Sequence, residues 1–250
     1  MTFDERGVSE VLGFIFIFSI IVASVGILYV SGVGSLTSAR NAEQSRNAQR
    51  AFSALATTFD DLQRGRAPAR AGEIRLSGGS LSVENETELR VVVDQTSPSA
   101  VTLNRTLSHG SLVYSFDGSV VRYEAGAVFG RSDGGSVTLR PPAFACGPDR
   151  AFVSSVSVVG AGGPSALRTD GSVLLVGRTA SKELVFPTDS TPQDAAQATT
   201  VRITVASSPN DAAWRRYFEG TGWSKNGSWY ECHTRRAVVR ETTVAFSVRD

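Results

Sequence analysis

The stretch that decides the fold is Val11–Val33, VLGFIFIFSIIVASVGILYVSGV, which contains no charged residue and is dominated by Phe, Ile, Val and Leu. As an α-helix it would extend about 34 Å, more than the roughly 30 Å hydrocarbon core of a bilayer. A secretory signal peptide has a shorter apolar region, about 7–15 residues, followed by a small-residue cleavage site. Gly32–Ser35 matches such a site poorly. The stretch therefore predicts a retained transmembrane helix at 11–33 rather than a discarded signal.

The residues before this helix carry a second pattern. Arg6-Gly7 followed by Val8-Ser9-Glu10-Val11-Leu12-Gly13 resembles the class III (prepilin) signal of archaeal type IV pilin-like proteins. In that family a prepilin peptidase cuts on the cytoplasmic side and leaves the helix attached. The resemblance implies a leader at 1–7 and cleavage between Gly7 and Val8. Arg6–Leu12 and the stretch DLQRGRAPARAGEIRL, Asp61–Leu76, also resemble an uncharacterised haloarchaeal group of pilin-like proteins.

Glu10 stands beside the apolar run, where an unpaired carboxylate is costly. Cleavage after Gly7 would create an ammonium at Val8, and in a bundle of helices Glu10 could neutralise the ammonium of an adjacent subunit. Glu10 would be the third mature residue, whereas bacterial pilins carry their acid at the fifth. The alternative places Glu10 in the headgroup region, where the positive end of the helix dipole favours it.

The helical pattern continues beyond the membrane segment. Phe52, Leu55, Phe59 and Leu62 recur at spacings of three and four, which predicts one apolar helix face. Arg64-Gly65 and Pro68 then provide a stop. We expect a helix from about Ser9 to Gln63, with a weak point at Gly32 and Gly34. The outer half of this helix would pack on a folded head. The alternative is a membrane helix, a break and a separate amphipathic helix.

Beyond Pro68 the apolar period changes to two, which is typical of strands. Leu112, Tyr114 and Phe116 alternate before Asp117-Gly118, and this pattern predicts a hairpin. Further strand-like runs are Glu73–Ser77, Leu89–Asp94, Val101–Leu107, Val137–Arg140, Phe152–Val159, Val173–Val176, Val201–Ala206 and Ala237–Val248. The fold class expected is α+β: a long N-terminal membrane and amphipathic helix, then a mainly antiparallel, β-sandwich-like head.

One segment of the head has helical rather than strand character. Ser208 is a suitable N-cap, Pro209 suits the first helical position, and Gly220 can end the helix. Trp214, Tyr217 and Phe218 would then share one face, either packed on the sheet or lining an aromatic-binding pocket. Trp223 and Trp229 flank a turn expected at Asn226-Gly227 and are interpreted as packing or surface aromatics.

Three triplets match the N-glycosylation acceptor sequence, at Asn85, Asn104 and Asn226. They mark a glycoprotein if the head is extracellular and are otherwise ordinary polar residues. The two cysteines, Cys146 and Cys232, lack CxxC spacing, so they are either free thiols or one long-range disulfide. Outside the cell the disulfide is favoured, because oxidation persists there.

The composition excludes several functions. A net charge of +1 with 20% charged residues gives no footprint for nucleic acid. His109 and His233 stand without nearby Cys or carboxylate clusters, and the chain shows no phosphate-binding loop or nucleophile elbow. We therefore expect no enzyme, no catalytic residues, no metal and no cofactor.

The predicted orientation of the helix, with the head outside the cell, goes against the positive-inside rule. Arg6 precedes the apolar run while Arg40, Arg46 and Arg50 follow it, so a positive-inside count favours an internal head. The signal-like motif, the acceptor triplets and the cysteine pair favour an external head.

The expected organisation is a leader (1–7), an N-terminal helix (8–65) and an extracellular head (66–250) in a single-pass membrane protein. The expected function is a pilin-like or minor-pilin-like subunit whose helix joins other pilin-like subunits in a type IV pilus-like surface filament. The alternatives are a non-polymerising, membrane-anchored binding domain and, least favoured, an anchored hydrolase.

Overall fold

The computed structural model describes residues 5–75, 78–96, 99–132, 134–162, 166–169, 171–187 and 199–249. Helix α1 runs without interruption from Glu5 to Gln63, so the predicted weak point at Gly32 and Gly34 is not a break. By its internal contacts the chain forms two compact units, one ending at Gln44 and one comprising Ser45–Asp250. The second unit contains the last part of α1 and the whole β region, and is called the head below.

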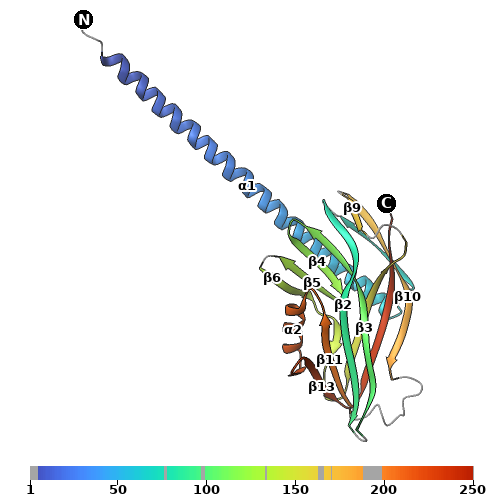
Figure 1. Ribbon diagram of the computed structural model, residues 1–250. Coiled ribbons are helices and arrows are strands. Elements are labelled where there is room, and N and C mark those ends of the chain that lie inside the picture. The colour runs from blue at the N-terminus through green and yellow to red at the C-terminus, as the bar shows by residue number, and fades with distance from the viewer. Residues whose placement is uncertain are drawn as a thin grey trace. The chain divides into compact units, whose positions relative to one another are not determined.

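The head consists of two curled sheets (Figure 1). Its strands are β1 (Ala69–Arg75), β2 (Gly79–Thr96), β3 (Ser99–Phe116), β4 (Ser119–Glu124), β5 (Ala127–Ser132), β6 (Gly135–Arg140), β7 (Ala143–Ala145), β8 (Ala151–Gly160), β9 (Ala166–Thr169), β10 (Ser172–Phe186), β11 (Thr199–Ser207), β12 (Ser224–Asn226), β13 (Trp229–Thr234) and β14 (Ala237–Arg249). One short helix, α2 (Asp211–Glu219), interrupts them.

Within the described residues, one sheet has five strands in the order β1-β10-β14-β8-β7. The other has nine, in the order β12-β13-β11-β2-β3-β4-β5-β6 with β9 paired to β2. Among the described residues, the strands pair antiparallel except β14 with β8, which are parallel. The expected helix followed by a mainly antiparallel sandwich-like head is confirmed.

The strands are longer than the sequence pattern predicts, and β3 shows why. Val101–Leu107 and Leu112–Phe116 were expected as separate runs, but both belong to β3, which passes through Gly110. Gly110 makes no turn. A Cβ there would stand 1.9 Å from the carbonyl oxygen of Val158 in β8, so the glycine permits close approach of the two sheets. The predicted hairpin after Phe116 is confirmed, with Asp117 and Gly118 both at positive φ.

The end of α1 belongs to the core of the head. Phe52, Phe59 and Leu62 are fully buried. Phe59 meets Tyr123 of β4 edge to face at 5.0 Å, and a Cβ on Gly177 of β10 would lie 2.9 Å from the Phe59 ring. The helix therefore contacts both sheets, as its apolar spacing predicts. Arg140 of β6 fixes it further by an ion pair with Asp60 at 2.6 Å.

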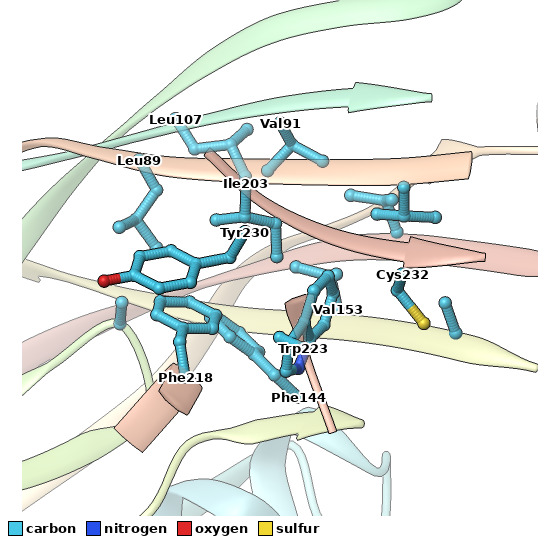
Figure 2. Packing of buried hydrophobic residues seen from close by; sticks show 14 of the residues in the cluster. Leu89, Val91, Leu107, Phe144, Val153, Ile203, Phe218, Trp223, Tyr230 and Cys232 are labelled. Carbon is cyan, nitrogen blue, oxygen red and sulfur yellow. The ribbon is translucent and has the colours of Figure 1, made fainter. Parts of the chain in front are cut away.

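A second core gathers around α2. Phe218 stacks on Tyr230 of β13 at 4.5 Å, and Phe144, Trp223 and Cys232 complete the surroundings (Figure 2). Because these rings fill the space between sheet and helix, the packing interpretation of Trp214, Tyr217 and Phe218 is confirmed.

The start of α2 differs from the prediction. The N-cap is Asn210 rather than Ser208, and the helix begins at Asp211. The Ser208 hydroxyl instead accepts the Asn210 backbone N–H and donates to Glu124 of β4. The predicted cap residue, Ser208, is thus bonded to the buried carboxylate of Glu124.

Candidate membrane and assembly surface

The first candidate surface is the apolar part of α1. Between Val11 and Leu36 its large side chains are all exposed; Phe14 is 68% accessible, Leu28 72% and Leu36 74%. The most apolar window has a mean hydropathy of 2.8 and no buried residue. The helix is long and apolar enough to serve as a membrane anchor or as a signal sequence.

Three hydroxyls in or next to this segment are compatible with lipid. The hydroxyls of Ser24, Ser35 and Thr37 each donate to the carbonyl four residues earlier, at 2.7, 2.8 and 3.0 Å. Such bonds satisfy a hydroxyl inside its own helix, so it needs no water or partner chain in an apolar medium.

The predicted signal lies at the beginning of α1. Because the helix starts at Glu5, the proposed cut between Gly7 and Val8 falls within its first turn, and Glu10 follows in the second. For these residues the structure describes the backbone alone. Near a helix N-terminus the unpaired N–H groups favour a negative charge.

The two cysteines form a disulfide. Cys146 follows β7 of the five-stranded sheet and Cys232 lies in β13 of the nine-stranded sheet, with their Cα atoms 5.7 Å apart. The bond therefore ties the two sheets together. Since disulfides persist in oxidising surroundings, it favours an extracellular head.

The three acceptor asparagines are all exposed but differ in setting. Asn85 lies in β2, and Thr87, the hydroxyl residue of the same triplet, is 1% exposed. Asn104 lies within β3 and accepts the Nε–H of Arg90 at 3.0 Å. Asn226 ends β12 beside a turn in which Gly227 has a φ of 60°.

The histidines lie apart. His109 is buried, and desolvation lowers its pKa to about 4, opposed weakly by the backbone of Leu107. Its Nε2 stands 3.7 Å from Glu241, whose own pKa is raised, chiefly by burial. His233 is exposed and bonds to Thr200 at 3.0 Å. In the described part of the chain no three His, Cys, Asp or Glu side chains converge as metal ligands would.

The sequence pattern did not reveal the buried carboxylate of Glu124 in the head. Glu124, fully buried, accepts hydrogen bonds from Ser208, Asn210 and the Trp214 indole at 2.5–2.8 Å. The group holds the start of α2 against β4. Glu124 is more than 80 residues away from each of its three donors in the chain, so only the fold brings them together.

The chain shows distant sequence similarity to an archaeal protein and matches a family model along most of its length. An uncharacterised protein of Archaeoglobus fulgidus is 24% identical over 165 residues, covering 51% of this chain. The chain spans about half the length of that relative, 53%. No solved structure matches the chain at a significant level. Residues 6–247 match the family described as a family of unknown function, DUF7289, which includes both the apolar helix and the head. The chain belongs to this family.

Proposed function

We propose that the protein is a membrane-anchored, pilin-like surface subunit that acts structurally rather than as an enzyme. The observation that supports this most is the apolar surface of α1 from Val11 to Leu36, which has no partner among the described residues and no charge. An exposed apolar surface of this extent requires lipid or other helices around it. The disulfide-linked head would face the cell exterior.

The proposed maturation keeps the helix. A prepilin peptidase removes residues 1–7, and Val8 becomes the N-terminus with a free ammonium group. Glu10, two residues further on, then supplies a carboxylate for the ammonium of a neighbouring subunit. In a helix bundle both charges would be costly alone, which is the physical reason for an acid at this position.

Substitution of Glu10 tests the assembly step. Glu10→Ala and Glu10→Gln should still insert and be processed, but their share in a sheared, sedimentable fibre fraction should fall at least about tenfold, equivalent to about 1.4 kcal/mol. Glu43→Ala is the matched control, because Glu43 is an exposed acid on the same helix. Normal incorporation of both Glu10 variants would refute the charge pairing.

Substitution of Gly7 tests the processing step separately. Gly7→Leu places a bulky side chain before the proposed scissile bond, so the leader should remain attached. Mass spectrometry of the N-terminal peptide would then show a chain that no longer begins at Val8. A variant processed like the wild type would rule out recognition of this motif.

The alternative is a permanently anchored binding domain that never polymerises. A shallow surface hollow supports it, lined by Ser136 and Val137 of β6 and by Arg216 and Tyr217 of α2. Arg216 donates to the carbonyl of Ser136 at this site. Wild-type protein found only in membranes, with none in sheared fibres, would favour this alternative.

A further inference from the structure

The hairpin of β12 and β13 places an acceptor asparagine directly opposite a tryptophan. Asn226 and Trp229 are cross-strand partners, and only Gly227 and Ser228 separate them in the chain. Directly opposed residues of an antiparallel pair project from the same face, with Cβ atoms about 4.5–5.5 Å apart. Asn226 is exposed and Trp229 is partly exposed, so both are accessible from outside.

The tryptophan is held in place by its neighbours. The guanidinium carbons of Arg90 and Arg202 lie 5.7 and 5.4 Å from the centre of the Trp229 ring. Arg202 is itself paired with Asp94 at 2.6 Å, and Arg90 donates to Asn104. Since β2 and β11 supply these contacts, the ring rests against the nine-stranded sheet as a fixed apolar platform on an otherwise polar face.

The other two acceptor triplets lack this arrangement. Asn85 has a hydroxyl partner, Thr87, that is buried and lies 3.4 Å from the Ser111 hydroxyl. Asn104 stands in the middle of β3, paired through the backbone with β2. The third triplet occupies a tight turn, and its Ser228 is exposed. All three asparagines are exposed, but the third triplet is the one that continues into a tight turn, the setting in which a surface enzyme finds the backbone least constrained.

We propose that Asn226 carries an N-linked oligosaccharide whose first sugar packs on the ring of Trp229. In the transfer, the Asn226 Nδ2–C bond to the anomeric carbon forms. The bond from that carbon to the phosphate oxygen of a lipid-linked oligosaccharide donor breaks, the lipid phosphate leaves with the electron pair, and one Nδ2 proton passes to a base of the transferase. The inference rests on the proposed function in one respect, that the head must face the exterior.

The local contacts of Asn226 survive this modification. Its Nδ2 now donates to Glu231 at 3.1 Å. A glycosylated amide retains one N–H, so it can keep this bond while the sugar extends over the neighbouring ring. The C–H face of a pyranose is apolar, and covering the indole with it removes apolar surface from water. The glycan thus stabilises the hairpin that carries Cys232.

The test uses full-length protein purified from native membranes. Glycopeptide mass spectrometry should find a glycan on Asn226 and none on Asn85. Enzymatic or chemical removal of the glycan should lower Tm by about 2–4 °C, the shift expected for a modest contact in a chain of this size. Ser228→Ala, which destroys the triplet but keeps Asn226, should reproduce that loss.

Variants of the ring distinguish the contact from bulk effects of a sugar. In Trp229→Ala the glycan should remain, but its removal should no longer change Tm; Trp229→Phe should retain part of the effect. An unmodified Asn226 overturns the inference, and so does a glycan effect that is equal in wild type and Trp229→Ala. A glycan on Asn104 alone would overturn it while leaving the external head intact. Absence of all glycans together with reduced cysteines would also contradict the proposed function.

Discussion

Gly110 shows how a single residue sets the distance between the sheets. A Cβ at this position would lie 1.9 Å from the Val158 carbonyl oxygen and 2.9 Å from Oδ1 of Asn85. The backbone of β8 cannot move aside without disturbing its pairing with β14. The sequence gives no sign of this role, because a glycine after a histidine is equally typical of a turn.

Gly110→Ala should therefore lower the free energy of unfolding by about 3 kcal/mol or more, since overpacking against backbone has no cheap relaxation. Urea denaturation of the head would measure the loss. Gly72→Ala in β1 is the control, because nothing lies within 4 Å of the Cβ position at Gly72. Equal stability of the two variants would contradict the close approach of β3 and β8.

His109 predicts an acid-dependent loss of stability. Its folded pKa of about 4 lies below the ordinary value of 6.5, so the unfolded chain binds the proton more readily. This residue's contribution is complete above pH 6.5 and is lost as the pH falls towards 4, about 3 kcal/mol in all. The raised pKa of Glu241 acts in the opposite sense, because the folded head favours its protonated form.

The difference between wild type and His109→Gln isolates the histidine. Unfolding free energies measured from pH 7.5 to 4 should converge as the pH falls, because the glutamine variant lacks this term. Parallel curves would show that the pKa of His109 is not lowered in the folded head.

At the scale of elements, the two parts of α1 lie in different surroundings. Its first part exposes apolar side chains all round, while from Ala48 onward the apolar residues face the core of the head. Both properties could be predicted from sequence, because an unbroken apolar run and a period of three to four residues are local signals. The extension of short expected runs into the long strands β2, β3 and β10 could not, since strand length depends on the partner strand.

A chain beginning at Ser45 should fold, and one beginning at Arg66 should not. The latter lacks four large side chains of the core, each contributing about 1.5–3 kcal/mol, against a typical net stability of roughly 5–15 kcal/mol. The lost residues are Phe52, Leu55, Phe59 and Leu62. Near-ultraviolet circular dichroism and thermal unfolding would compare the two chains. A cooperative transition in the Arg66 chain would show that the helix is dispensable for the head.

The disulfide links β13 to the residue after β7, and sequence alone does not decide whether these two cysteines pair. It joins residues separated by 86 positions, for which the loop-entropy relation gives about 4.5 kcal/mol. Reduction should lower the unfolding free energy by about that amount. The Cys146→Ala, Cys232→Ala double variant should match the reduced protein and be insensitive to reductant. Equal stability of the oxidised and reduced forms would mean that the bond adds nothing to the head.

At the scale of the whole molecule, sequence predicts the layout better than the topology. The apolar helix and the β-rich head follow from composition and period, whereas the sequence leaves open whether Cys146 and Cys232 pair. The parallel pairing of β14 with β8 and the buried contacts of Glu124 do not, because each joins segments distant in the chain. For the apolar part of α1, the pattern identifies a membrane-length helix, and none of the described residues covers its side chains.

The most direct measurement is the N-terminal sequence of the native protein, taken from membrane and surface fractions together with its intact mass. The proposal predicts a chain that begins at Val8, retains residues 11–33 and sediments with membranes or fibres. A soluble species that begins after Gly34 would contradict it, because such a chain has lost the helix on which both anchoring and assembly depend.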